Sequence, residues 1–352
     1  MNEVSHENAK KTPSINDVAK LAGVSVSSVS RYLNNAAHLR DEKKHRIAQA
    51  IEMLDYHPSL LARGLAANRS KTIALFTGSK LLYGVTGCIQ GIEAAASKAG
   101  AVVDVVLLDK HQEPGKMRQT IKSTLSVNPC GVIIDQPRYD TGSEMVLREV
   151  KKDVPLVLIG GNRIEGQCQL FTYDDHGGYR ITQHLLSLGH KTVFHVAVPE
   201  EDESQTRQSG WRRALEEAGA VVPPLYRTSW DPLDAVEVGR KLGQRDDVTA
   251  VFAGNDEIAL GVIRGLYSVG KRVPQDVSVA GFDNNPIASL SIPSLTTWRQ
   301  DFEHIGIFAT DLILDQIAGN LDTELKTAHY VGDTAEQLII RESTAAPPAQ
   351  SR

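Results

Sequence analysis

The residues best suited to contact a partner lie in one short stretch, SVSSVSR, from Ser25 to Arg31. The forked guanidinium of Arg31 matches the O6 and N7 acceptors of guanine. Val26 offers a methyl contact to thymine, and Ser27 can donate or accept a hydrogen bond. Short polar side chains around them suit phosphate oxygens, which position a protein on a duplex without reading its sequence. The residues expected to contact DNA here are Ser25, Val26, Ser27, Ser30, Arg31, Asn34 and His38.

A second set of polar residues follows short apolar runs in the latter half of the chain. Asn255 comes after the run AVFA, and Asp283 comes directly after VSVAGF. Ligands of open α/β sheets bind beyond the carboxyl ends of the strands. A sugar ring has an apolar face that stacks on an aromatic side chain and a rim of hydroxyls that needs donors and acceptors. The residues expected to bind such a small molecule are Arg207, Trp230, Asn255, Asp283 and Gln300.

Several of these residues also have a purely structural interpretation. Asn255 and Asp283 stand at turns, where Asn and Asp are common because they hydrogen-bond their own backbone. Trp230 could pack in the core without touching a ligand. The run from Asp174 to His176 could bind a metal, but Gly177 and Gly178 follow it at an expected helix start. We therefore expect this run to cap a helix and no metal to bind.

Local signals predict the elements that hold the first set. Ser14 can cap a helix, with Asp17 three residues later, and Gly23 ends it. Ser25 can cap a second short helix, and a third is expected over 41–55. Two short helices joined by a tight glycine turn are typical of a helix-turn-helix, although a pair of serine-rich surface helices is the alternative. The residues expected to face inward are Ile15, Val18, Ala19, Ala22, Val29, Tyr32, Leu33, Ile47, Ala50, Ile51 and Leu54.

From Lys71 onward, short apolar runs alternate with helical patterns, which predicts βαβ units and parallel sheets. This alternation of strands and helices occurs twice, which predicts an α/β fold with two lobes around a cleft. The expected strands are 72–77, 102–108, 131–135, 155–159, 192–198, 250–253 and 277–282, and 295–299 is expected to cross back. The expected helices are 88–99, 114–127, 144–151, 177–188, 205–218, 232–242, 257–269 and 302–318.

Four motifs between Asp17 and Leu65 resemble the lactose/galactose repressor (LacI/GalR) family of bacterial transcription regulators: D-V-A-x-x-A-G-V-S, V-S-R, Y-x-P and A-R-x-L. The resemblance implies a DNA-binding head over 1–58, then a hinge helix and linker over 59–70. Leu65 would wedge into the minor groove, an established way to kink DNA. The family shares a two-lobed, periplasmic-binding-protein-like core, here 71–342, with the chain crossing between lobes near Phe171, Trp298 and His329. This places the N-lobe at 71–170 and 301–328 and the C-lobe at 172–298 and 330–342, before a disordered tail at 343–352.

The chain departs from the family pattern at two places in this region. Arg40, Asp41, Lys43 and Lys44 replace the usual Ser or Thr cap and Thr-Arg pair, so Asp41 is expected to cap the third helix instead. The hinge helix opens on Ser59 where the family usually has Asn. Ser is a comparable cap, so hinge ordering should be retained.

The resemblance extends to the ligand residues. The segments S-x-x-R-x-x-G-W, G-N-D-x-x-A-L-G, G-F-D and S-L-T-T-x-x-Q-D-F match stretches that contact effectors in the family. The set looks closest to the galactoside-responsive branch, although glycines at 78, 160 and 161 leave few polar side chains on the N-lobe side. The resemblance implies a repressor whose operator affinity is controlled by a small sugar, such as a galactoside. A purine or protein corepressor is the alternative.

Charge, cysteine content and the absence of certain motifs narrow the classes of protein to which this chain could belong. The net charge is −5; residues 1–70 hold ten Lys or Arg against seven Asp or Glu, so the head is +3 and the remainder −8. No secretory signal or membrane span is evident, which favours a cytoplasmic protein over a transport sugar-binding protein. Three distant cysteines fit a reducing compartment. Neither a phosphate loop nor a nucleophile elbow is present, so we expect no enzyme and no cofactor. No leucine heptad follows Ile340, which predicts a homodimer.

Overall fold

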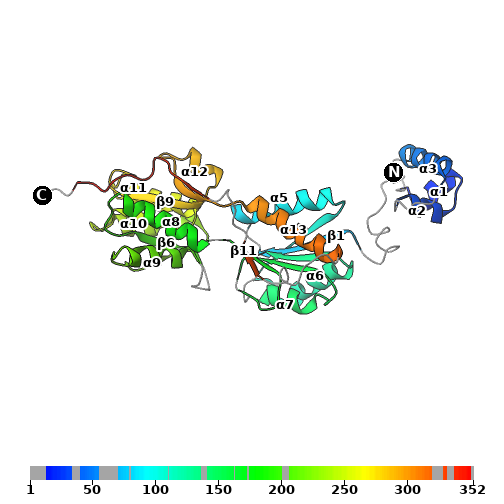
Figure 1. Cartoon of the computed structure of the whole chain (residues 1–352), viewed down its shortest axis with the longest axis horizontal. Coiled ribbons are helices and arrows are strands. Elements are labelled where there is room, and N and C mark those ends of the chain that lie inside the picture. Colours follow the sequence, from blue (N-terminus) through cyan, green and yellow to red (C-terminus); the bar gives the residue numbers. More distant parts are fainter. Residues whose placement is uncertain are drawn as a thin grey trace, which may run out of the picture.

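The computed structural model describes residues 13–33, 40–54, 70–78, 81–109, 111–135, 141–161, 163–172, 174–199, 206–318, 328–330 and 337–349. Figure 1 shows three bodies: a small helical head, and two α/β lobes that we call the N-lobe and the C-lobe. The head lies at the N-terminal end of the chain, and the C-terminus lies beyond the C-lobe. This organisation confirms the predicted fold class of a helix-turn-helix head followed by a two-lobed core.

The head consists of α1 (Ile15–Ala22), α2 (Val26–Leu33) and α3 (Asp41–Met53). A complete capping box starts α1, because Ser14 and Asp17 each accept from the backbone N–H of the other. Gly23 ends it in the left-handed region at φ 63°, which a residue without a Cβ adopts at little cost. The three helices close around a small apolar core of Val18, Ala19, Ala22, Val29, Ile47 and Ala50.

One prediction for the head is wrong. Arg40, and not Asp41, occupies the cap position of α3, and its side chain makes no capping hydrogen bond. Asp41 lies in the first helical turn, where it pairs with Lys44 at 3.0 Å between Oδ1 and Nζ. A carboxylate in the first turn still complements the helix dipole.

The N-lobe is a three-layer sandwich around a six-stranded parallel sheet with the order β11-β5-β4-β3-β1-β2. Helices α5 and α13 pack on one face, and α6 and α7 pack on the other. Helices α5 and α13 approach closely: a Cβ on Gly91 would lie 2.0 Å from the carbonyl oxygen of Glu303. The strands are β1 (Thr72–Gly78), β2 (Val102–Leu108), β3 (Gly131–Asp135), β4 (Leu156–Ile159), β5 (Gln169–Phe171) and β11 (Ala328–Tyr330). The helices are α5 (Tyr83–Lys98), α6 (Pro114–Ser126), α7 (Thr141–Glu149) and α13 (Phe302–Ala318).

The C-lobe repeats this architecture, with the sheet order β12-β10-β9-β8-β6-β7 and β12 antiparallel to β10. Helices α10 and α11 cover one face, and α8 and α9 cover the other. The strands are β6 (Phe194–Ala197), β7 (Tyr226–Arg227), β8 (Ala250–Ala253), β9 (Ser278–Asp283), β10 (Thr296–Arg299) and β12 (Gln337–Ile339). The helices are α8 (Asp174–Ser187), α9 (Arg207–Glu217), α10 (Pro232–Gly243), α11 (Asp256–Ser268) and α12 (Pro286–Leu290).

Both sheets have a point at which the strand order reverses. In the N-lobe this point lies between β1 and β3, and in the C-lobe between β6 and β8. In open α/β sheets the crevice beyond the carboxyl ends of the strands at this point is where ligands bind. Polar side chains at these two positions are therefore the first candidates for a ligand site.

The chain passes between the two sheets three times. The passages lie between β5 and α8, between β10 and α13, and between β11 and β12. Tyr330, which we assigned to the C-lobe, pairs with Phe171 in the N-lobe sheet. Residues 296–299, expected only to cross back, form the fifth parallel strand of the C-lobe sheet beside β9.

The prediction of a disordered tail from Ser343 onward is wrong for its first residues. Ser343 is fully buried, and its hydroxyl donates to the carbonyl of Val279 while accepting from the N–H of Thr296. The Ala345 N–H donates to the hydroxyl of Ser278. These bonds reach residues more than 40 positions earlier in the chain, which is why composition alone misjudged the segment.

Candidate DNA-binding head and interlobe effector site

The second helix of the head presents its predicted contact residues to solvent. Val26 is 41% exposed, and Ser25, Ser27 and Arg31 are exposed as well. The hydroxyl of Ser25 accepts from the N–H of Ser28 at 3.3 Å, so the predicted cap of α2 is present. Val29 points the other way, into the head core. The face of α2 that carries Val26, Ser27 and Arg31 is therefore available to enter a major groove.

Part of the predicted DNA contact set falls outside this description. Asn34, His38 and Leu65 lie outside the described residues, as does the whole predicted hinge helix over 59–67. Ser30 belongs to α2, but its side chain also lies outside the description. The roles of these residues remain predictions.

In the C-lobe, the structure brings Arg207 and Asp283 together as predicted. Asp283 is the last residue of β9, and Arg207 is the first residue of α9. The Nη2 of Arg207 lies 3.3 Å from Oδ1 of Asp283, and both side chains are only 10% exposed. The guanidinium also donates from Nη1 to the carbonyl of Gly254, just after β8, and stacks over the Phe282 ring at 4.0 Å. This fixes the cation at the strand ends where a ligand would bind.

The buried Oδ1 of Asp283 has hydrogen-bonding capacity that its own lobe does not use. It lies 3.3 Å from Nη2 of Arg207, yet it accepts no hydrogen bond from any residue that the structure describes. Its backbone φ of 97°, followed by 54° at Asn284, is rare outside glycine and indicates a conformation held by the surrounding fold. Burial raises the pKa of Asp283 to about 6, although the nearby Arg207 opposes this shift. Such an open, buried acceptor suits a hydroxyl or amine donor on a ligand.

Asp174 joins this cluster, although we expected it only to help cap a helix. Its Oδ2 accepts from Nε of Arg207 at 3.1 Å, and its Oδ1 accepts from Nε2 of Gln300 and, at 2.7 Å, from the hydroxyl of Thr172. Among the described residues, no group of three metal-ligating side chains lies together. The predicted contact residues Arg207 and Gln300 thus meet on a carboxylate that sequence reasoning did not assign to the site.

Asn255 and Trp230 have structural roles in the C-lobe. The Oδ1 of Asn255 accepts from the N–H of Ile258 at 2.8 Å and caps α11. Trp230 is half-buried and packs against the apolar core beneath α10 and α11. Neither role prevents a ligand contact, and both contacts stay predictions.

The N-lobe contributes a polar pair that we did not predict. Asp135 ends β3 and accepts at 3.0 Å from the hydroxyl of Thr77, near the end of β1. These two strands flank the point where the N-lobe sheet reverses order. Burial raises the pKa of Asp135 to about 7. The signal was present in the sequence, since GVIID ends an apolar strand on an acid in the same way as VSVAGFD.

A cavity of about 560 Å³ is lined by residues from both lobes. Its N-lobe side includes Tyr83 and Gln90 of α5, and its C-lobe side includes Asn284, Ser289 and Arg341. The pKa of Tyr83 is raised, first by burial and then by the carboxylates of Asp283 and Asp256. The N-lobe helix α5 therefore lies within electrostatic reach of the C-lobe ligand residues.

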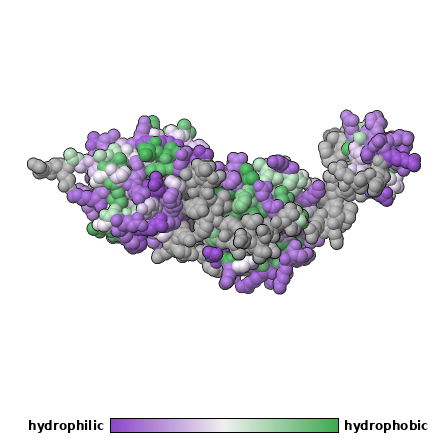
Figure 2. Space-filling view, in the orientation of Figure 1, coloured by the Kyte–Doolittle hydropathy of each residue, from purple (hydrophilic) through white to green (hydrophobic). Residues whose placement is uncertain are grey.

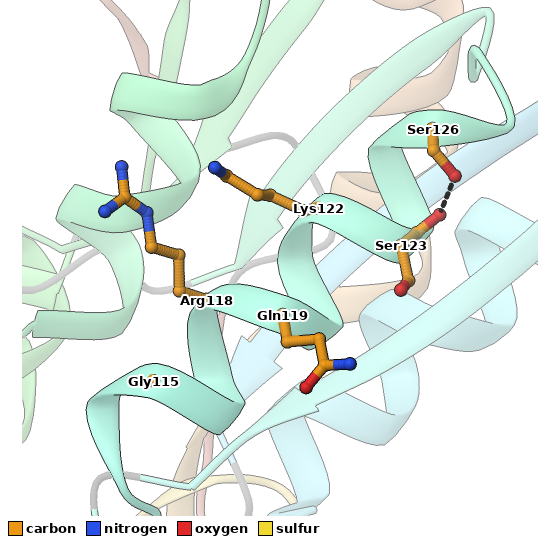
Figure 3. A pocket seen from close by; sticks show the side chains of 6 residues that line it. All are labelled: Gly115, Arg118, Gln119, Lys122, Ser123 and Ser126. Carbon is orange, nitrogen blue, oxygen red and sulfur yellow. Dashed lines mark hydrogen bonds between the residues drawn. The ribbon is translucent and has the colours of Figure 1, made fainter.

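A second hollow, of about 400 Å³, lies along α6 of the N-lobe (Figure 3). Its two cations, Arg118 and Lys122, both pair with Glu149 of α7, at 2.8 and 3.9 Å. The Ser126 hydroxyl donates to the carbonyl of Ser123. Because both of its cations are paired with Glu149, this surface is a weaker candidate for an anionic ligand than the strand ends of the C-lobe.

A DNA-reading helix pair on a core of two α/β lobes, with a polar cluster at the lobe crossings, defines a DNA-binding transcriptional regulator with an effector-binding core. Comparison with known proteins agrees with this class. Residues 14–59 match the model of "Bacterial regulatory proteins, lacI family", and residues 182–344 match "Periplasmic binding protein-like domain". The chain is 30% identical to the HTH-type transcriptional repressor PurR of Mannheimia succiniciproducens over 334 residues, 94% of this chain and 98% of that protein. The chain belongs to the LacI family of bacterial regulatory proteins.

Solved structures show the same similarity. The chain superposes on a Lac repressor dimer bound to operator and the anti-inducer ONPF with a TM-score of 0.82 and 25% identity, over 96% of this chain and 100% of the other. A complex of the transcriptional regulator CelR with cellobiose gives a TM-score of 0.69 and 26% identity, over 94% and 99% of the two chains. The LacI family comprises transcriptional regulators, so the prediction of a non-enzyme is confirmed. None of the described helices is both long and apolar enough to cross a membrane.

Proposed function

We propose that this protein is a homodimeric repressor that binds a palindromic operator, and that a small sugar, such as a galactoside, bound between the lobes controls its operator affinity. The observation that carries the ligand part is the buried, open acceptor of Asp283 beside the fixed cation of Arg207. It lies at the carboxyl end of a parallel strand, where α/β sheets bind ligands.

The charge distribution around the site favours a ligand rich in hydrogen-bond donors. Asp283 and Asp174 line the C-lobe side, and Asp135 ends the N-lobe strand that borders the order reversal. The guanidinium of Arg207 is already balanced by two carboxylates, so an added phosphate would meet net negative charge. Sugar hydroxyls can donate to Asp283 and Asp135, whereas both oxygens of Asp174 already accept from protein groups. Among the similar structures, one was solved with cellobiose and one, from Enterococcus faecium, with ribose.

A purine effector is the second candidate. It is favoured by the PurR proteins of Mannheimia succiniciproducens and Erwinia tasmaniensis, each 30% identical to this chain. A purine has a flat π-face and would need aromatic neighbours, which Trp230 and the edge-to-face pair of Tyr83 and Phe302 could supply. The two candidates differ in ligand and share the same protein mechanism.

The proposed dimer follows from symmetry and from the surface of the C-lobe. Two heads read two half-sites when protein and operator share a two-fold axis. Apolar side chains are exposed at and after α12: Ile287 is 43% exposed, Leu290 79% and Ile292 91%. Figure 2 shows apolar residues gathered on this side of the C-lobe. Covering such a patch with a second copy removes it from water, and the similar Lac repressor was solved as a dimer.

The proposed mechanism is a population shift between two lobe arrangements. An effector changes operator affinity only by the ratio of its affinities for the two arrangements. The N-lobes of the dimer lie next in the chain to the hinge segment, so their relative placement would decide whether the two hinge helices form on the operator. In that case Leu65→Ala lowers operator affinity and DNA bending and leaves effector affinity unchanged.

Tryptophan fluorescence gives a direct test of the ligand. All three tryptophans, Trp211, Trp230 and Trp298, lie in the C-lobe. The full chain is titrated with galactosides, other sugars and purines, with Trp230→Phe as the control for the reporter. A saturable response to a galactoside supports the proposal. A response to purines alone replaces the sugar with the second candidate.

The DNA part is tested separately. Arg31→Ala should lose about 1–3 kcal/mol of preference for operator over unrelated DNA, while weak, salt-sensitive binding persists. Arg46→Ala, an exposed cation of α3 outside the predicted reading face, is the matched control. Unchanged specificity in Arg31→Ala would show that another residue reads the operator.

A further inference from the structure

We infer that Asp174 is a positioning residue that couples the effector site to two of the three crossings between the lobes. The inference rests on the proposed function, because it concerns how a bound effector would reach the lobes. It starts from the position of Asp174 itself. Asp174 is the first residue of α8, directly after the chain leaves the N-lobe strand β5.

One carboxylate ties together two segments that are far apart in the sequence. Thr172 lies in the first crossing, between β5 and α8, and Gln300 lies in the second, between β10 and α13. Both donate to Oδ1 of Asp174, and Gln300 is 126 positions away from it. Hydrogen bonds to an ionised acceptor are roughly twice as strong as neutral ones. Asp174 therefore fixes the spacing of two of the three crossings about which the lobes would rotate.

The other oxygen of the same carboxylate holds a predicted effector contact. The Oδ2 of Asp174 accepts from Nε of Arg207 at 3.1 Å, and the far side of that guanidinium faces Asp283. A ligand that binds between Arg207 and Asp283 weakens the interaction of the guanidinium with Asp283 and so alters its interaction with Asp174. The altered ion pair with Asp174 would change the hydrogen bonds that Asp174 accepts at both crossings, although the ligand contacts neither crossing.

The neighbouring Asp175 provides a matched comparison. It also lies in the first turn of α8, and it forms two bonds where Asp174 forms three: to Nη2 of Arg213 at 2.7 Å and to the hydroxyl of Ser209 at 2.9 Å. Both partners belong to α9, so Asp175 joins two helices of one lobe and touches neither crossing. Its replacement controls for the loss of a carboxylate at this helix start.

The first measurement needs no effector. Amide hydrogen exchange is followed in the full-length protein for wild type, Asp174→Asn and Asp175→Asn. Asp174→Asn should exchange about tenfold faster in the peptides that cover 171–176 and 297–303, since the loss of a charge-assisted bond lowers the opening free energy. Asp175→Asn should stay within about twofold of wild type there. Equal exchange in all three proteins, or an equal rise in both variants, overturns the inference.

The second measurement separates positioning from binding. Operator affinity is measured with and without the compound that saturates the wild-type tryptophan signal, methyl β-galactoside being the first probe. Asp174→Asn should keep effector affinity within about tenfold while its operator response falls to less than twofold. A full response in Asp174→Asn overturns the coupling. A wild type that responds to no sugar or purine defeats the proposed function and leaves the exchange result as an independent test of the clamp.

Discussion

The N-lobe and the C-lobe have equivalent sheet orders but differ in the polar groups at the ends of their strands. Both place helices on two faces of a six-stranded sheet that reverses order at one point. In the C-lobe, Arg207 opens the helix that follows β6, donates to Gly254 after β8, and pairs with both Asp174 and Asp283. In the N-lobe the reversal point holds one neutral hydroxyl, Thr77, against the lone buried acid Asp135.

This difference indicates that the two lobes would contribute differently to effector binding, although they share one architecture. In the C-lobe the guanidinium of Arg207 is held by two carboxylates, those of Asp174 and Asp283, which would fix it in place for an effector. The N-lobe acid has no cation beside it among the described residues that surround Thr77, and burial alone raises its pKa to about 7. A ligand that bridges the lobes would give Asp135 a second donor beside Thr77, which is the differential interaction that a two-state switch requires. Four substitutions test this comparison.

Of the four substitutions, Arg207→Ala should lower the free energy of unfolding the most. It leaves the buried Asp283 and the partly buried Asp174 without their cation, and breaking a buried pair costs about 3–5 kcal/mol. Urea unfolding followed by tryptophan fluorescence reports the C-lobe, where all three tryptophans lie. Arg213→Ala, at a half-exposed ion pair, should cost less than about 1 kcal/mol. Equal losses in the two variants would contradict a special role for the Arg207 network.

Asp135→Asn should raise the free energy of unfolding, whereas Arg207→Ala lowers it. Burial raises the folded-state pKa of Asp135 to about 7, whereas its ordinary value is 3.8. Its ionised form therefore destabilises the N-lobe above pH 7, and the penalty is relieved as the pH falls from 7 toward 4. The variant should be more stable at pH 8 by up to about 4 kcal/mol, and the advantage should vanish near pH 4.

Far-UV circular dichroism is the appropriate probe for that experiment, because the N-lobe contains no tryptophan. The exposed Asp104 of β2, in the same sheet, gives the control variant Asp104→Asn. A stability that does not depend on pH in the wild type, or a gain shared by Asp104→Asn, would show that Asp135 is not the buried charge.

Asp283→Asn should weaken effector binding by about 10- to 100-fold, because a hydrogen bond to a charged acceptor contributes about 1.5–3 kcal/mol. DNA binding should be retained, so the variant represses without responding. Burial raises the pKa of Asp283 to about 6, so wild-type affinity should fall as the pH drops below 6, while the variant should show a flat profile. Titrations between pH 5 and 8 check this. The exposed Asp246→Asn should behave as wild type.

Trp230→Phe should have the smallest effect. Phe retains a ring for stacking and for packing against the C-lobe core, so effector affinity should change by less than about fivefold. The fluorescence response should shrink more than the affinity does. A loss of affinity as large as that of Asp283→Asn would make Trp230 a principal contact and move the ligand toward β7.

Local signals in the sequence determined the head and many of the core elements. The Ser14–Asp17 capping box, Gly23 and the Ser25 cap act over three or four residues, so they can be read without knowing the fold. Helix α5 starts at Tyr83 and not at the predicted Cys88, because its first turn has no side-chain cap to mark it. The short strands β5, β11 and β12 and the helix α12 were missed for a related reason: each has only three to five residues and depends on neighbours for its stability.

The sequence by itself determined the family, the alternation of strands and helices, and the acids and amides that follow strands, since all of these are written in adjacent residues. Only the tertiary structure decided which of those groups meet. Thr77 and Asp135 are 58 positions apart, and Gln300 and Asp174 are 126 apart. Such pairs depend on strand order and on where the chain crosses between lobes. The same long-range packing orders Ser343 to Ala345, whose composition alone predicts disorder. Residue types therefore set which chemistry is available, and the packing of distant segments sets which residues perform it.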